Sequence, residues 1–79
     1  MTELEKTLSD IAKFLVDDPD SVTVGSRENG DSVTLSLNVA PDDMGKVIGK
    51  HGKIARAIRV VMKSAGNRYG KKVTVDIED

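Results

Sequence analysis

The chain has no cysteine and a single histidine, His51, among its 79 residues. Without cysteine, neither a disulfide framework nor a thiolate metal site can form. One histidine does not make a metal cluster, and the residues beside it supply neither the nucleophile nor the orienting acid of a catalytic triad. The composition therefore predicts no metal and no cofactor, and a protein that is not an enzyme.

Long apolar runs are also missing. No segment approaches the roughly 20 apolar residues that cross a bilayer, and the N-terminal MTELEK lacks the basic region and apolar stretch of a signal peptide. We therefore expect a cytoplasmic protein with no membrane association. A chain of 79 residues has enough material for one hydrophobic core, which predicts a single domain over residues 1–79.

Acidic and basic residues are segregated along the chain. Residues 1–43 hold ten acids and three bases, whereas residues 44–75 hold nine bases and no acid. The nine bases are Lys46, Lys50, Lys53, Arg56, Arg59, Lys63, Arg68, Lys71 and Lys72. A solvated helix usually mixes both signs of charge, so an acid-free basic block indicates a polyanionic ligand.

The N-terminal half is predicted to form a helix and a β-hairpin. Thr2 and Glu5 fit a capping box, and the helix should end near Asp17-Asp18-Pro19 because the residue before proline avoids helical geometry. The apolar stripe of this helix is Leu4, Leu8, Ile11 and Leu15. A short strand over residues 22–25, the hairpin signal Asn29-Gly30 and strict alternation over residues 33–39 follow.

The C-terminal half is predicted to form two helices and a strand. Pro41-Asp42-Asp43 marks the start of a short helix that runs to about Ile48. The second helix would run from near Gly52 to Ala65, with Gly66 as its C-terminal cap. Its expected apolar face is Ile54, Ala57, Ile58, Val61 and Ala65, roughly opposite Arg56, Arg59 and Lys63. Alternation over residues 73–77 predicts the last strand.

The element order is therefore α-β-β-α-α-β. Three strands with one apolar face each, covered by three helices on that face, make an α+β two-layer sandwich. The helical connection before the last strand is long enough to permit a parallel pairing, so the three-stranded sheet can be mixed.

The joint between the two C-terminal helices is Gly49-Lys50-His51-Gly52. Glycine allows a sharp turn at positive φ and a close backbone approach. The unpaired amides at the start of the second helix favour an anion such as phosphate, and Lys50 and Lys53 add positive charge. The stretch Gly45–Lys50 is not a P-loop, because that motif needs four residues between its glycines and a serine or threonine after its lysine, whereas here three residues separate the glycines and His51 follows.

The segment VIGKHGKIARAIR, Val47 to Arg59, resembles the core signature of KH domains, and the element order resembles the type II, prokaryotic form. The resemblance covers the whole chain and is greatest to small bacterial proteins made of one KH domain. It implies that Gly49–Gly52 clamps about four nucleotides of single-stranded RNA. The residues implied in RNA binding are Gly49, Lys50, His51, Gly52, Lys53, Lys46, Arg56 and Arg59, with an apolar floor for the bases at Val47, Ile48, Ile54, Ala55 and Ile58.

The resemblance also implies a low sequence specificity and a role as an RNA chaperone or post-transcriptional regulator, linked in that family to cell shape and envelope growth. The implied partners are single-stranded RNA and either a second copy or a larger KH-containing RNA-binding protein, with no small-molecule substrate.

Other readings remain open beside this one. The domain can be chiefly a protein-interaction module, pairing through its strand edges or N-terminal helix, or a helix-turn-helix that reads duplex DNA. RNA readers that stack bases on several aromatic platforms are excluded, since Phe14 and Tyr69 are the only aromatic residues. We expect Phe14 in the core and Tyr69 in a loop.

Overall fold

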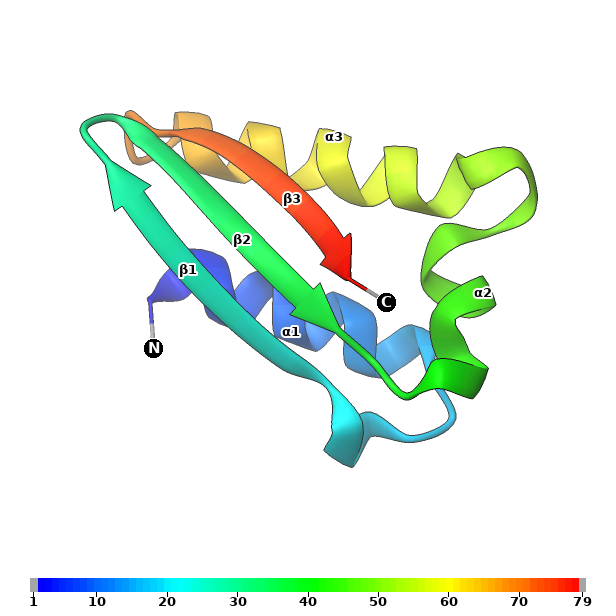
Figure 1. Cartoon of the computed structure of the whole chain (residues 1–79). Helices are drawn as coiled ribbons and strands as arrows, with labels where there is room; N and C mark the ends of the chain where they lie inside the picture. The colour runs from blue at the N-terminus through cyan, green and yellow to red at the C-terminus, as the bar shows by residue number, and fades with distance from the viewer. Residues whose placement is uncertain (1, 79) are drawn as a thin grey trace.

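The computed structural model of the chain describes residues 2–78. Its α-helices are α1 (Glu3–Leu15), α2 (Met44–Ile48) and α3 (Lys53–Asn67), and its strands are β1 (Thr23–Asn29), β2 (Ser32–Asn38) and β3 (Lys72–Glu78). Figure 1 shows the sheet as one layer, α1 and α3 side by side behind it, and α2 at one end. The α+β sandwich and its α-β-β-α-α-β order are confirmed.

The sheet is mixed, as the long helical connection permits. Its strand order is β1-β2-β3, with β1 antiparallel and β3 parallel to the central β2. Leu35 of β2 lies opposite Ser26 of β1 and Val75 of β3. Because side chains alternate across a strand, this register aligns the apolar residues of β2 and β3 on the face that the helices cover.

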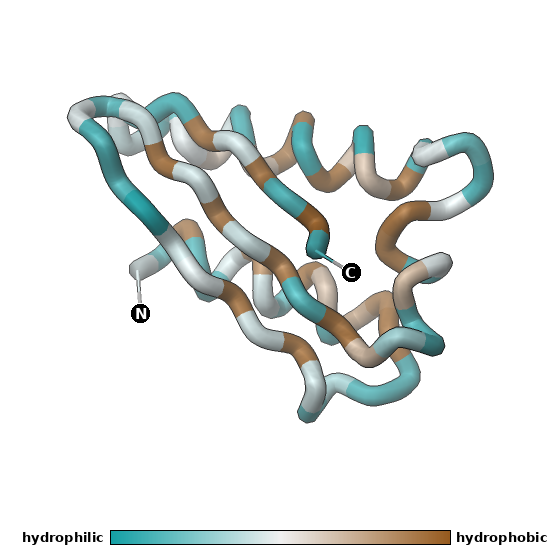
Figure 2. Tube along the Cα trace, in the orientation of Figure 1, coloured by the Kyte–Doolittle hydropathy of each residue, from teal (hydrophilic) through white to brown (hydrophobic). Residues whose placement is uncertain are grey.

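The core lies between that face and the helices. Figure 2 shows the alternation of apolar and polar residues along the strands. The largest fully buried side chains are Leu8, Leu35, Leu37, Met62 and Val47. They come from α1, β2, α3 and α2, so all three helices contribute to one cluster.

Helix α1 begins at the predicted capping box. The Glu5 amide donates to Thr2 Oγ1 at 3.2 Å, and the Thr2 amide donates to Glu5 Oε1 at 3.4 Å. The prediction for Phe14 was wrong, because its side chain is 93% exposed. The buried residues of α1 are Leu4, Leu8, Ser9 and Ala12, and Phe14 lies outside the stripe that they form.

The hairpin between β1 and β2 differs from its prediction by one residue. Asn29 pairs with Ser32 as the last residue of β1, so the two-residue turn is Gly30-Asp31. Gly30 has a φ of 62°, and it is the first turn residue, as a type II′ turn requires. The first strand is also longer than residues 22–25, and a 3₁₀ turn over Pro19–Ser21 precedes it.

Helix α3 continues past its predicted end to Asn67, so Gly66 is inside the helix and is not its cap. A Cβ at Gly66 would lie 2.4 Å from Val73 Cγ2 and 2.9 Å from the backbone oxygen of Lys71. Glycine at this position therefore lets α3 pack closely against the start of β3.

The predicted apolar face of α3 is only partly its buried face. The buried residues are Ala55, Ile58, Met62 and Gly66, whereas Ala57 and Val61 are exposed. The contact with β3 rotates the core-facing side of the helix away from the predicted stripe, and Arg59 and Val75 lie at that contact.

Candidate nucleic-acid interface

The Gly49–Gly52 loop joins α2 to α3 through three residues with positive φ. These are Gly49 at 74°, His51 at 57° and Gly52 at 73°. His51 is the one non-glycine residue with positive φ within residues 2–78. Histidine is among the side chains that tolerate this region best. The chain thus turns sharply between the two helices without proline or a long connection.

The two glycines of the loop are required for different reasons. A Cβ at Gly49 would lie 2.6 Å from Ile54 Cγ1, so this position needs glycine both for its φ and for the close approach of Ile54. A Cβ at Gly52 would have no neighbour nearer than Arg56 Nη1 at 3.9 Å, and only its φ of 73° favours glycine. Gly52 therefore leaves open space at the start of α3.

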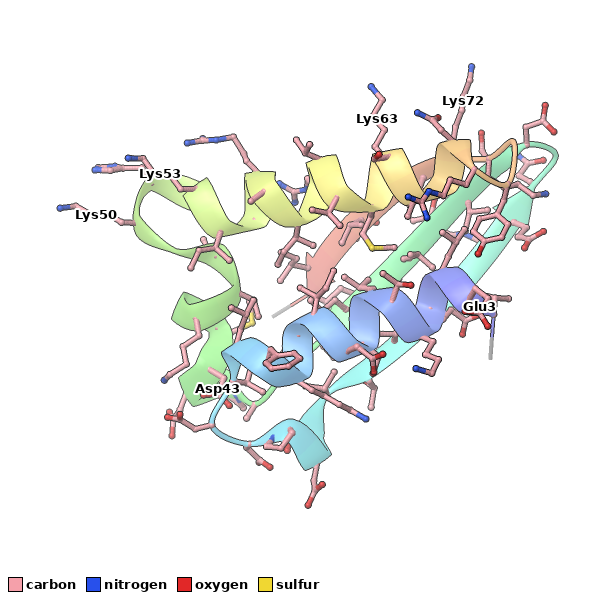
Figure 3. The ribbon with its side chains drawn as sticks, turned by 180° about the vertical axis from the view of Figure 1, so that it is seen from behind. Glu3, Asp43, Lys50, Lys53, Lys63 and Lys72 are labelled. Atoms are coloured by element: carbon pink, nitrogen blue, oxygen red, sulfur yellow. The ribbon has the colours of Figure 1, made fainter. Side chains whose placement is uncertain are left out.

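Backbone donors of the loop are available to a ligand. The Gly49 amide donates to Gly45 O, the Gly52 amide to Gly49 O and the Lys53 amide to Lys50 O. Within residues 2–78, the amides of Lys50 and His51 have no such acceptor. Figure 3 shows the Lys50 and Lys53 side chains pointing away from the molecule at this end. Exposed amides beside ammonium groups suit an anionic oxygen.

The cations near the loop differ in what they contact. Among residues 2–78, the side chains of Lys50, Lys53 and Arg56 form no ion pair. Arg59 Nε donates to the carbonyl oxygen of Val75 at 3.2 Å, which holds this side chain against β3.

Lys46 is the exception among the predicted RNA-binding cations. Its Nζ lies 3.1 Å from Asp17 Oδ2 and 3.5 Å from Asp43 Oδ1. The hydrogen bond to Asp17 and the negative charges of both carboxylates raise the pKa of Lys46. Its charge is thus balanced within the chain, which leaves it less available to a phosphate.

Asp43 is a buried carboxylate that ties the start of α2 to the segment after α1. It accepts hydrogen bonds from the amides of Asp17 at 3.2 Å and Asp18 at 3.0 Å. Burial alone would raise the pKa of Asp43, but these amides and Lys46 outweigh it and hold the pKa below its ordinary value. Because α2 leads directly into the loop, Asp43 helps to position Gly49–Gly52.

The apolar candidates for a base-contacting floor fall into three groups. Val47, Ala55 and Ile58 are buried in the protein, so they lie beneath the surface that a base would contact. Ile54 is half-buried. Ile48 is 37% exposed and is the candidate with the most accessible apolar surface. Fewer than five of the predicted apolar residues are therefore accessible to a base.

A second exposed surface lies between α1 and α3. Its apolar residues belong to the apolar faces predicted for the two helices, and Lys53, Ile54 and Ile58 were also implied in RNA binding. An open apolar groove there is lined by Ile11, Leu15, Lys53, Ile54, Ala57, Ile58 and Val61. Phe14 follows Ile11 by three residues and so extends the same side of α1. The spacing of three residues between Ile11 and Phe14 indicates that both lie on one side of α1. Periodicity alone does not indicate whether another element covers that side.

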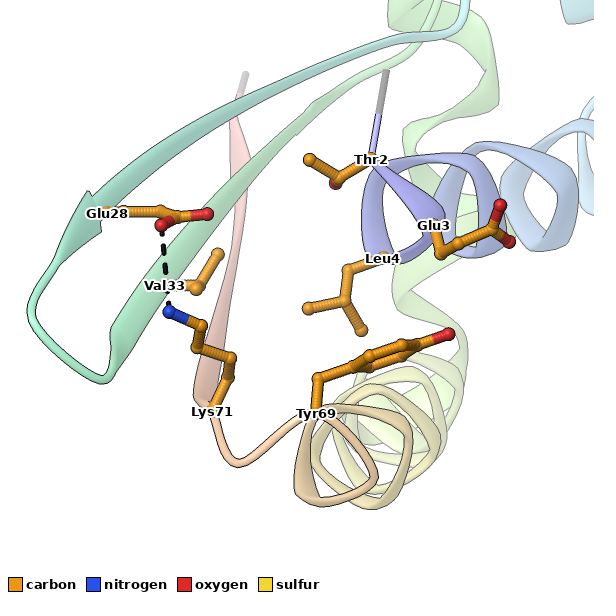
Figure 4. A pocket seen from close by; sticks show the side chains of 7 residues that line it. All are labelled: Thr2, Glu3, Leu4, Glu28, Val33, Tyr69 and Lys71. Carbon is orange, nitrogen blue, oxygen red and sulfur yellow. Dashed lines mark ion pairs between the residues drawn. The ribbon is translucent and has the colours of Figure 1, made fainter.

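A smaller cavity lies at the opposite end of α3 from the loop (Figure 4). It has a volume of about 200 Å³ and is lined by Thr2, Glu3, Leu4, Glu28, Val33, Tyr69 and Lys71. Lys71 Nζ lies 3.7 Å from Glu28 Oε2 at its rim. Tyr69 follows α3, which is about 22 Å long at 1.5 Å per residue over its 15 residues. Tyr69 is therefore a loop residue, as expected, and lies far from the Gly49–Gly52 loop.

Two further features bear on function. None of the helices within residues 2–78 has the length and apolar content needed to span a bilayer. Within the same range, no three His, Asp or Glu side chains come together in a way that could hold a metal ion.

Comparison with known proteins gives one consistent result. Residues 5–77 match the family model described as KhpA/KhpB, KH domain. The chain is 51% identical to the RNA-binding protein KhpA of Clostridium acetobutylicum, over 94% of this chain and 99% of that protein. It is 52% identical to the KhpA of Caldanaerobacter subterraneus subsp. tengcongensis over 98% and 99% of the two chains. It is 42% identical to the KhpA of Aquifex aeolicus over 98% of each.

Proposed function

The chain belongs to the KhpA/KhpB family of KH domains, and from this premise we propose that it binds single-stranded RNA at the Gly49–Gly52 loop. The family is non-enzymatic, in agreement with the prediction from composition. The loop would hold the phosphates of about four nucleotides, with Lys50, His51 and Lys53 beside them. Ile48 would contact the bases, and Arg56 and Arg59 would extend the positive charge along α3.

The observation that supports this proposal most strongly is the exposed backbone of the loop. The amides of Lys50 and His51 have no acceptor within residues 2–78, and Gly52 leaves space in front of the first turn of α3. A phosphate can therefore approach the backbone without a side chain in its path. Backbone contacts carry no sequence information, so we expect low sequence specificity.

Low specificity fits an RNA chaperone or post-transcriptional regulator acting in the cytoplasm. From the family resemblance, we also propose that this role is linked to cell shape and envelope growth. Binding through one loop is weak, and a contact with about three phosphates predicts a slope of log K against log salt near −2.

The test is the double variant Lys50→Asp with His51→Asp, measured by fluorescence anisotropy with a short single-stranded RNA. Aspartate tolerates positive φ, so the loop should keep its shape and the circular dichroism spectrum should not change. We expect an affinity loss of about tenfold or more, because two anions replace groups that face phosphate. The control is Lys6→Asp with Lys13→Asp on α1, which lowers the net charge by one unit more than the loop variant and should still bind like the wild type. Undiminished RNA binding by the folded loop variant would refute the clamp.

A helix-turn-helix function predicts the opposite preference in the same assay. The second helix begins Gly52-Lys53-Ile54-Ala55, which has no Asn, Gln or Arg to read base edges. Tighter binding to duplex DNA than to single-stranded RNA would favour that alternative.

We also propose that the apolar groove between α1 and α3 pairs with another KH domain. Val61, which lines this groove, is 48% exposed, and exposed apolar surface commonly marks a protein interface. Phe14, elsewhere on α1, is 93% exposed. Either a second copy or a larger KH-containing RNA-binding protein would cover it. Pairing would also raise the avidity of two weak RNA sites. Sedimentation of the purified chain distinguishes these partners, since a dimer at micromolar concentration identifies the second copy.

A further inference from the structure

The basic residues of α3 continue well past the loop. Arg56, Arg59 and Lys63 lie on the flank of α3 that faces β3, where Arg59 contacts Val75. Lys63 is ten residues from Lys53, which places it about 15 Å along the helix. None of the contacts proposed for the Gly49–Gly52 loop involves a cation so far along α3.

Lys72 joins this flank from the first residue of β3. Gly66, one helical turn after Lys63, packs against Val73, and Val73 is the neighbour of Lys72 in the chain. Figure 3 shows Lys63 and Lys72 pointing away from the molecule on the same side. The structure thus brings together two lysines that are nine positions apart in the sequence.

Neither lysine is neutralised by an acid. Within residues 2–78, Lys6, Lys46 and Lys71 form ion pairs, whereas Lys63 and Lys72 form none. A nearer acid is Asp31, whose backbone oxygen accepts a hydrogen bond from the Lys72 amide at 2.8 Å, but its carboxylate forms no ion pair with Lys72. The acids that share the outer sheet face with Lys72 are Asp76 and Glu78, about 13 Å and 20 Å further along β3 at 3.3 Å per residue. At physiological salt these distances exceed the Debye length of about 8 Å.

The opposite side of the loop has the opposite charge. Lys46 is paired with Asp17 and Asp43, and Asp18, Asp20 and Asp42 follow or precede them in the sequence. A polyanion leaving the loop in that direction meets repulsion, whereas along α3 it meets unpaired cations. The charges therefore favour one direction for a bound strand.

We propose that Lys63 and Lys72 form a second phosphate-binding site, so that a bound RNA strand continues from Gly49–Gly52 along α3 beyond four nucleotides. This inference rests on the proposed function, because it extends the same RNA path. It predicts that affinity depends on RNA length and that the dependence resides in these two lysines.

The test compares single-stranded oligouridines of about four and about ten nucleotides. The wild type should bind the longer RNA more tightly. Lys63→Glu with Lys72→Glu should remove this gain and leave the short RNA unaffected, since Lys63 lies about two Debye lengths from the loop. The salt slope for the longer RNA should become shallower by about 1.4, at about 0.7 for each lost phosphate contact.

The matched control is Lys6→Glu with Lys13→Glu, which changes the net charge by the same amount on α1 and should retain the length dependence. Circular dichroism should be the same for all three proteins. The second site is refuted if Lys63→Glu with Lys72→Glu binds the longer RNA as the wild type does, or weakens both lengths equally. A wild type that binds neither length overturns the loop proposal itself, so the two failures are distinguishable.

Discussion

Helix α3 has two exposed flanks of opposite chemistry on either side of one buried face. The flank toward β3 carries Arg56, Arg59 and Lys63, and the flank toward α1 carries Ile54, Ala57 and Val61. Between them, Ala55, Ile58, Met62 and Gly66 pack into the core. One helix thus presents a cationic surface and an apolar surface, which meet at Lys53 and Ile54 at its start.

The two flanks of α3 suit two different kinds of ligand. A cationic flank attracts a polyanion at a distance, whereas an apolar flank gains free energy only when it is removed from water. We therefore propose that RNA binds on the β3 side and a protein partner on the α1 side. Changes to α3 can remove both surfaces or either one alone.

The largest effect is expected from a substitution that displaces α3 and so disrupts both of its flanks. Gly66→Val places side-chain atoms where Val73 and the backbone of Lys71 already lie. The unfolding free energy should therefore decrease by an amount near the upper end of the range of about 1–3 kcal/mol. Urea denaturation measures this loss. Gly45→Val is the matched control, since nothing lies within 4 Å of a Cβ there, and it should change stability by only a few tenths of a kcal/mol. Equal stabilities of the two variants would contradict the close packing at Gly66.

The next largest effects are expected from two substitutions that each impair one flank of α3 and leave the other intact. Val61→Asp places a charge in the apolar groove and should weaken self-association by about 30-fold, the size expected when an interface residue worth about 2 kcal/mol is lost. RNA affinity per chain should stay the same.

Arg56→Asp should do the reverse, weakening RNA binding and leaving self-association intact. Sedimentation and fluorescence anisotropy measure the two properties, and a variant that changes both equally contradicts the division of α3 into two surfaces.

The smallest effect concerns Asp43, at the end of the molecule that neither flank reaches. Its lowered pKa means that the folded state binds protons more weakly than the unfolded state. Its contribution to stability is therefore present above the ordinary carboxyl pKa of about 4 and is lost as the pH falls through the lower folded value. Asp43→Asn should be less stable than the wild type at neutral pH, and the difference should shrink in acid.

Denaturation midpoints at several pH values test this expectation. Asp42→Asn, at an exposed neighbouring position, is the control and should follow the wild type throughout. A difference between Asp43→Asn and the wild type that stays constant with pH would show that the charge of Asp43 is not involved.

Much of the fold was predictable because its signals are local. The capping box at Thr2, the alternation over residues 33–39 and 73–77, and the order of the elements all agree with the structure. The hairpin turn was misplaced by one residue because Asn29 and Gly30 both suit a turn, and strand register decides between them. Gly66 was assigned to a helix end because a glycine that permits a close approach looks the same in sequence as a cap.

The candidate site was predictable to a smaller extent. Gly49 and Gly52 stand out by their spacing within an acid-free block, and both have positive φ. The same reasoning did not anticipate that Lys46 pairs with Asp17, a residue distant in sequence. It also placed Phe14 in the core, whereas that residue is 93% exposed.

The sequence by itself determined the order of the helices and strands, where the chain turns between α2 and α3, and which half carries the positive charge. These features follow from backbone preferences and side-chain periodicity, which act over a few residues. Only the tertiary structure decided which cations are unpaired and which apolar side chains remain in water. Ion pairing and burial depend on residues brought close by folding, and the positions of those residues in the chain do not reveal that proximity.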